Sequence, residues 1–191
     1  MKKNIISLFL LISFSVAKSQ IDKAIWLVGG SGSFSSTKNT FNSPNYSQTS
    51  DVVGIKISPN IGYFIFEKLA IGLRPSFSKD KAQVTTAAGG YTNVNRFEIG
   101  PFVRYYFLNK EKPYNILTDI SFQTGLYAFR SDKGTNNTFS ASVGPVIYFN
   151  SSVGLEFLLG FYRRNEKVKE VFETIQEGFQ IGIGFQIHLE K

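Results

Sequence analysis

The sequence predicts an all-β fold, an eight-stranded antiparallel up-and-down transmembrane β-barrel that follows a cleaved signal peptide. The clearest observation is Phe179–Leu189, where every odd position is large and apolar and every even position is Gly, Gln or His. Successive side chains of a strand point to opposite faces, so this alternation puts all the apolar groups on one side. Several earlier segments repeat the pattern, and the first residues are typical of an export signal.

Residues 1–19 have the three parts of a signal peptide. Lys2 and Lys3 supply positive charge, Ile5–Val16 is a short apolar core, and Ala17–Ser19 places small residues where a signal peptidase cleaves. The alternative is an uncleaved anchor, but a core of about 12 residues is short for a membrane helix, which needs about 20. We expect residues 20–191 to form a single outer-membrane barrel domain.

Composition narrows the class of protein further. The formal charge is +7 over 191 residues, and it falls to +4 without the signal, which holds three Lys and no acid. The remaining basic residues are scattered, so nothing favours nucleic-acid binding. Cys is absent, which excludes disulfides and thiolate metal sites. Closing a sheet into a barrel pairs every strand edge and stabilises such an exported chain.

Four alternating segments make up the first half of the predicted barrel. Their apolar faces are Trp26, Val28 and Phe34 in Ala24–Ser35; Ile55, Ile57, Ile61, Tyr63 and Ile65 in Val52–Ile65; Leu69, Ile71, Leu73 and Phe77 in Leu69–Ser78; and Phe97, Ile99, Val103, Tyr105 and Phe107 in Val94–Phe107.

Four more segments complete it, of which the first alternates least cleanly. Their apolar faces are Ile120, Phe122 and Leu126 in Ile116–Phe129; Phe139, Ala141, Val143, Ile147 and Phe149 in Thr138–Phe149; Val153, Leu155, Phe157, Leu159 and Phe161 in Val153–Tyr162; and the odd positions of Phe179–Leu189.

Alternation alone also fits a soluble lipocalin-like barrel, whose apolar face would surround a ligand. The polar face, however, is rich in Gly and Ser, as the narrow lumen of eight strands requires. It also carries a mixed set of charges, which we expect to pair inside the lumen: Lys56, Arg74, Arg96, Glu98, Arg104, Asp119 and Glu156. Aromatic residues recur where even-numbered strands end and predict an interfacial girdle: Tyr63, Phe64, Tyr105, Tyr106, Phe107, Tyr148 and Phe149. These features favour a membrane barrel.

The connections between the predicted strands differ in length. Those after strands two, four and six are mostly short: Phe66–Lys68, Leu108–Asn115 and Asn150–Ser152. Those after the odd-numbered strands are mostly longer: Ser36–Asp51, Lys79–Asn93, Arg130–Asn137 and Arg163–Ile175. We therefore expect periplasmic turns, long extracellular loops and both termini in the periplasm. Within the last loop we expect the carboxylates of Glu166, Glu170 and Glu173 to be solvated.

Long or bulky side chains on the polar face are expected to fill the lumen and block conduction. They are Arg74, Arg96, Phe102, Arg104, Tyr106, Gln123, Tyr127, Tyr148 and Tyr162.

The second, fourth and sixth predicted strands share a small residue, a Pro and an aromatic end: Ser58–Phe64, Gly100–Tyr106 and Gly144–Phe149. Pro cannot donate to a strand ladder, so three at equivalent depth predict a shared bulge or a local widening of the pairing. With the last amphipathic strand, these segments resemble the small eight-stranded outer-membrane β-barrel family of Gram-negative bacteria, the OmpA/OmpX-type barrel. The resemblance implies an integral outer-membrane monomer that contacts outer-membrane lipid and lipopolysaccharide and is folded by the barrel-assembly machinery.

Signals for chemistry are weak. His188 is the only His and is expected to be a lumen-facing polar residue near the periplasmic end. Gly29–Gly32 lacks the Lys-Ser/Thr ending of a phosphate loop, and no carboxylates have metal-ligand spacing. We therefore predict no catalytic residue, cofactor or metal. The leading function is a structural or surface-interaction barrel with a filled polar lumen. A narrow pore or transporter for small or apolar solutes is the alternative, and a lipid A-modifying enzyme is a distant one.

Overall fold

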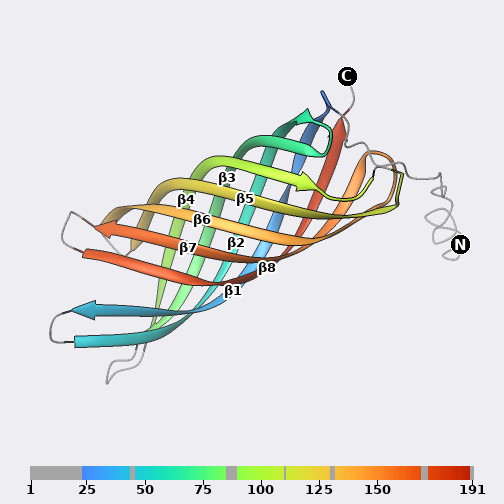
Figure 1. The fold of residues 1–191 in the computed structure, drawn as a ribbon. Coiled ribbons are helices and arrows are strands. Elements are labelled where there is room, and N and C mark those ends of the chain that lie inside the picture. Colours follow the sequence, from blue (N-terminus) through green and yellow to red (C-terminus); the bar gives the residue numbers. More distant parts are fainter. Residues whose placement is uncertain are drawn as a thin grey trace, which may run out of the picture.

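The computed structural model describes residues 23–43, 46–84, 90–109, 111–129, 132–168 and 172–189. They form a closed barrel of eight antiparallel strands in up-and-down order, which confirms the predicted fold (Figure 1). The predicted signal peptide lies outside the described residues. The strands are β1 (Trp26–Ser43), β2 (Tyr46–Phe66), β3 (Leu69–Val84), β4 (Gly90–Tyr106), β5 (Tyr114–Phe129), β6 (Asp132–Tyr148), β7 (Val153–Val168) and β8 (Phe172–Leu189).

The barrel closes because β8 pairs back onto β1, starting at Trp26 opposite Leu189. Following the paired residues once around the wall from Trp26 leads to Ser36, ten residues further along β1. A stagger of this kind tilts the strands, as Figure 1 shows, and eight tilted strands leave an interior just wide enough for side chains. We call the end of the barrel where β1 begins and β8 ends the terminal end, and the opposite end the distal end.

The strands extend further toward the distal end than the sequence predicted. Only residues 44–45, 85–89, 130–131 and 169–171 separate strands there, against residues 67–68, 107–113 and 149–152 at the terminal end. The prediction of long loops at one end is therefore wrong. Strand pairing continues past the apolar part of the wall, where outward positions such as Lys79, Lys81 and Arg163 are polar. Apolar alternation is lost there although the strand continues.

Of the described hairpins, the one formed by β1 and β2 extends furthest beyond the closed wall. β1 and β2 pair with each other as far as Ser43 opposite Tyr46. In contrast, the pairing of β1 with β8 stops at Asn39, and that of β2 with β3 stops at Val52. Residues 40–43 and 46–51, which we call the β1–β2 ribbon, therefore have edges that no other described strand pairs. The ribbon is visible at the lower left of Figure 1.

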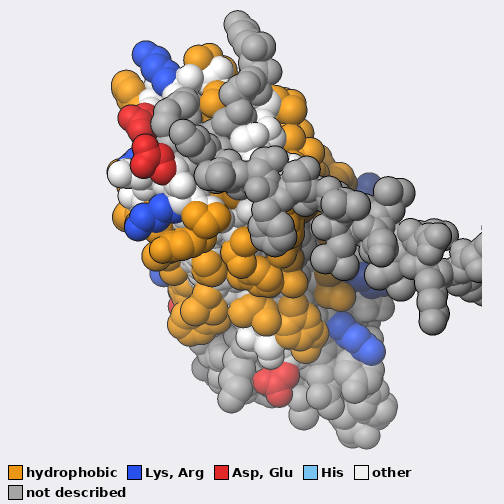
Figure 2. Space-filling model, turned by 90° about the vertical axis from the view of Figure 1, so that its right-hand side faces the viewer, with side chains coloured by type: hydrophobic (Ala, Val, Ile, Leu, Met, Phe, Trp, Pro, Cys, Tyr) orange, Lys and Arg blue, Asp and Glu red, His pale blue; other side chains and the backbone are white. Residues whose placement is uncertain are grey.

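The apolar face of the wall points outward. Ile55, Leu126 and Phe179 are each more than 60 % exposed, and Ile99 and Val143 are also exposed. In the view of Figure 2 the described surface is mostly hydrophobic, and charged side chains on it are few. Water would disfavour so large an apolar surface, whereas lipid favours it. No helix in the described ranges is long and apolar enough to cross a membrane.

The three repeated prolines locally widen the sheet. Pro59, Pro101 and Pro145 are exposed on the outer face. Each has a paired residue in one neighbouring strand, but the pairing with the other neighbour is interrupted at or beside it. The register is the same on both sides of each gap, so the prolines widen the pairing without adding a bulge.

A layered lumen as candidate functional site

The lumen is organised in layers, and β4 passes through most of them. From the terminal end its inward side chains include Tyr106, Arg104, Phe102, Glu98 and Arg96. Residues two apart on a strand are about 7 Å apart, so each step along β4 reaches a new level of the interior. The levels are an aromatic plug, an inner charge cluster, a serine-lined cavity and an outer charge cluster.

The aromatic plug closes the terminal end. The rings of Phe64, Tyr106 and Tyr148 surround the imidazole of His188, with centroid distances of 5.5, 6.0 and 5.9 Å. All four side chains are buried, and Leu27 beside them is fully buried. The plug is held by apolar packing and edge-to-face ring contacts.

This arrangement corrects part of the predicted girdle. Phe64, Tyr106 and Tyr148 point into the lumen, because neighbouring residues of a strand face opposite sides and a run of aromatics cannot all face lipid. The other members remain on the outer surface at the terminal end, namely Tyr63, Tyr105, Phe107 and Phe149. Three aromatics that the prediction left out are exposed there too, namely Trp26, Phe66 and Tyr114.

The inner charge cluster contains two bases and two acids from four strands. Arg74 on β3 donates from both terminal nitrogens to the carboxylate of Asp119 on β5, at 2.6 and 2.7 Å. Arg104 on β4 donates from Nε to the same carboxylate at 3.0 Å and from Nη1 to Glu156 on β7 at 2.7 Å. The Arg74 guanidinium lies 4.5 Å from the ring centroid of Phe102, a cation–π contact. The four charges sum to zero.

The outer charge cluster contains three bases and three acids. Glu98 accepts from Lys56 at 2.9 Å and from Asn136 and Thr138, and its other contact is the Nε of Arg164 at 3.7 Å. A second group is centred on Asp80, which pairs with Arg96 at 2.7 Å and with Arg164 at 3.1 Å. The Nε of Arg96 also pairs with Glu166 at 2.5 Å. Arg164 links the two groups, so the cluster is one balanced network.

Sequence reasoning found seven members of the two clusters and missed three. The structure places the seven predicted charged residues in the lumen, where each makes at least one ion pair. The missed residues, Asp80, Arg164 and Glu166, lie in segments predicted as loops. Glu166 was expected to be solvated, which is wrong because it faces inward and pairs with Arg96. Glu170 lies outside the described residues, and the side chain of Glu173 is not among those described.

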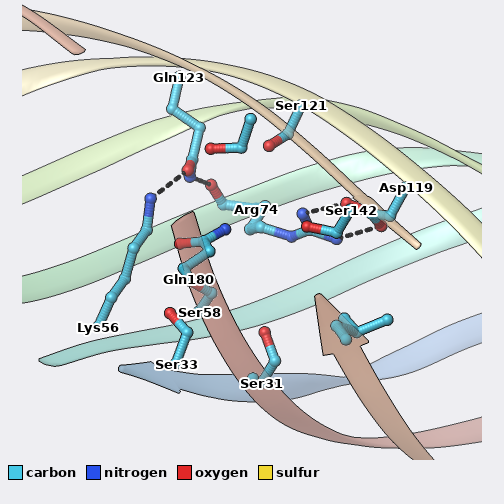
Figure 3. A pocket seen from close by; sticks show the side chains of 13 residues that line it. Ser31, Ser33, Lys56, Ser58, Arg74, Asp119, Ser121, Gln123, Ser142 and Gln180 are labelled. Carbon is cyan, nitrogen blue, oxygen red and sulfur yellow. Dashed lines mark hydrogen bonds and ion pairs between the residues drawn. The ribbon is translucent and has the colours of Figure 1, made fainter. Parts of the chain in front are cut away.

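A small polar cavity of about 40 Å³ lies between the clusters (Figure 3). Lys56 donates to Gln123 at 2.7 Å, and Gln123 donates to the carbonyl oxygen of Arg74 at 2.7 Å, so the cavity is bridged from side to side. Six serines contribute hydroxyl groups to its wall: Ser31, Ser33, Ser58, Ser121, Ser140 and Ser142. A space of this size holds roughly two or three waters. All nine side chains that were expected to fill the lumen are buried.

Within each cluster the charged side chains pair with one another rather than present free ligands. Within the described residues, no three or more His, Asp or Glu side chains are grouped to hold a metal ion. The carboxylates that face the lumen accept from Arg, Lys or amide donors. The arrangement therefore suits a rigid, filled interior.

No known protein-family profile matches the chain, and no curated protein matches it. Two of the solved structures that share its fold cover most of this chain. The chain is similar to Neisserial surface protein A, with 14 % identity, a TM-score of 0.51, and 85 % of this chain and 96 % of that one covered. It is also similar to the outer-membrane protein OprG from Pseudomonas aeruginosa, with 9 % identity, a TM-score of 0.55, and 92 % and 100 % covered. At such identities the likeness concerns the fold, the small eight-stranded barrel of outer-membrane proteins.

Proposed function

We propose that this protein is an integral bacterial outer-membrane barrel with a non-conducting lumen, acting as a structural or surface-interaction protein through its distal end. The observation that carries the proposal is the layered filling of the lumen. Two neutral ion-pair clusters and an aromatic plug follow one another along the axis. Conduction needs a continuous water path, and each layer interrupts it.

The proposed location is supported by the exposed apolar wall. Outer-membrane lipid would cover it, with lipopolysaccharide in the outer leaflet and the barrel-assembly machinery as the folding partner. The terminal end would face the periplasm, because outer-membrane barrels commonly keep their chain ends there. The extended strands of the distal end would then stand outside the cell.

The interaction role is supported by the β1–β2 ribbon. Its two edges carry backbone groups without a partner in any other described strand. Unpaired strand edges are templates for a further strand, so a partner would be an extended peptide segment that adds to the ribbon. Backbone hydrogen bonds would supply the affinity.

Planar-bilayer recording tests the closed lumen. We expect no sustained current from the wild-type protein. Arg104→Ala alone should remain silent, because the plug and the outer cluster still block the axis. Shortening one blocker at each level, as in Tyr106→Ala with Arg104→Ala, Gln123→Ala and Arg164→Ala, should open a leak. Steady single-channel currents from folded wild type would replace this proposal with the pore or transporter alternative.

Panning a random peptide library on the protein in nanodiscs tests the interaction role. The comparison is a variant in which residues 40–49 are replaced by a two-residue Asn-Gly turn between the paired Asn39 and Ser50, which keeps the register of the closed wall and removes most of the ribbon. We expect peptides of extended-strand composition to be enriched on wild type and lost on the variant. Equal enrichment on both proteins would contradict a role for the ribbon.

A further inference from the structure

The outer wall is hollowed along β1. The outward positions Gly30 and Gly32 carry no side chains, and two adjoining apolar hollows of about 690 and 380 Å³ lie over them. Both hollows are lined by Gly32 and by Ile183 of β8. Exposed side chains on either side form the banks of this β1 groove: Ile55 and Ile57 on β2, Ile181 and Ile183 on β8, and Phe157 and Leu159 on β7.

The floor of the groove is open at Gly32. A Cβ atom added there would meet no atom within 4 Å, whereas one added at Gly30 would lie 3.0 Å from the Cα of Pro59. The groove belongs to the apolar wall, which faces lipid if the protein spans a membrane. Water is absent from the hydrocarbon core, so an apolar hollow there is filled by an acyl chain or by another protein.

Basic side chains stand at the distal end of the groove. Lys79 is paired across the sheet with Ile55 on one bank and is exposed. Arg163 lies four residues beyond Leu159 of the other bank, about 13 Å along β7, and is also exposed. The exposed charged residues described toward this end are mostly basic: Lys79, Lys81, Lys133, Arg163 and Lys167, against Asp51 and Glu177. The groove thus joins an apolar floor to a cationic rim.

We propose that the β1 groove binds one acyl chain of a phosphorylated outer-leaflet lipid of the lipid A type, whose phosphate lies at the rim near Lys79 or Arg163. The proposal rests on the proposed outer-membrane location and not on the closed lumen. A second copy fits the groove less well. Two copies facing each other at equal depth would oppose hollow to hollow and bring the same basic residues together, which is unfavourable.

Native mass spectrometry of the protein released from nanodiscs tests the site. The nanodiscs contain phosphatidylethanolamine with a minor fraction of bisphosphorylated lipid A. Gly32→Ile fills the groove where space is open, and Ala141→Ile adds a similar bulk to the outer face of β6 as the matched control. We expect wild type and Ala141→Ile to retain one lipid A, and Gly32→Ile to retain about tenfold less.

The charged rim is tested separately, because its variants leave the groove intact. Lys79→Gln with Arg163→Gln should also lower retention about tenfold, while Lys133→Gln, further from the groove, should not. If Gly32→Ile retained as much lipid A as wild type, the groove would not be the binding site. If wild type retained dephosphorylated lipid A as well as bisphosphorylated lipid A, the proposed role of the basic rim would be overturned. A wild-type dimer that Gly32→Ile abolishes would assign the groove to a second copy instead. Heat-modifiable migration on gels confirms that each variant is folded, and silence in bilayers is independent of all these outcomes.

Discussion

The aromatic plug and the inner charge cluster lie one step apart on β4, at Tyr106 and Arg104, yet different forces hold them. Around Tyr106 the contacts are ring against ring, with His188 at the centre. Around Arg104 they are charge-assisted hydrogen bonds to Asp119 and Glu156. The stability of the plug should therefore fall when side-chain volume is removed, and that of the charge clusters when one charge of a balanced set is removed. One narrow lumen is filled by two kinds of packing with different sensitivities.

Removing volume from the plug is the change expected to have the largest effect. Phe64 is fully buried between Tyr106 and His188. Phe64→Ala should lower the free energy of unfolding by about 3–5 kcal/mol, because the cavity cannot collapse in a rigid barrel. Phe64→Leu keeps most of the volume and should cost under about 1.5 kcal/mol. Urea unfolding in lipid vesicles measures both, and equal losses for the two variants would show that volume is not what matters.

Removing one charge from the outer cluster without changing its shape is the next test. Glu98→Gln leaves Lys56 and Arg164 without their shared carboxylate, and the loss should be about 3 kcal/mol. The same unfolding assay applies, and a urea midpoint equal to that of wild type would argue against a buried network. Phe64→Leu is the useful reference, because it too keeps most of the side-chain volume but removes no charge.

An ion pair on the outside of the same wall should matter least. Arg163 and Glu177 are 3.2 Å apart, with about half of each side chain exposed. Arg163→Ala should cost about 0.2–1 kcal/mol, since water and salt screen such pairs. Adding salt should remove this small difference while leaving that of Glu98→Gln nearly intact. A loss for Arg163→Ala as large as that for Glu98→Gln would erase the distinction between buried and exposed pairs.

The sequence predicted the barrel because the outward side chains of its strands are apolar and most of the inward ones are polar. Where both faces are polar, that signal vanishes. Arg163 and Arg164 show this, since one faces outward and the other lines the lumen. The inward series on β7 runs Glu156, Leu158, Gly160, Tyr162, Arg164 and Glu166, so continuing the parity past Tyr162 would have found two of the three missed residues. The same step past Ser78 on β3 reaches the third, Asp80.

The pairing of charges was beyond prediction for a different reason. Arg74 on β3 binds Asp119 on β5, a strand that is not its neighbour. Such a contact crosses the lumen, and it depends on the stagger of all eight strands, which no local pattern of residues encodes. The error in the girdle was avoidable, because alternation within Tyr105–Tyr106 already requires that one ring face inward.

The pairing of β1 with β8 also sets the order in which the strand pairs form during folding. Every other pair of strands is joined by a connection of two to seven residues, whereas Trp26 and Leu189 meet across the whole sheet. Short loops close at small entropic cost and long ones at greater cost, so the hairpins should form first and the seam last. Until the seam closes, the growing sheet keeps two free edges and an interior whose charges still face their surroundings. Inserting such a sheet into lipid unassisted would be unfavourable, so the final zipping of β1 to β8 is the step at which an assembly factor that holds a free strand edge would act.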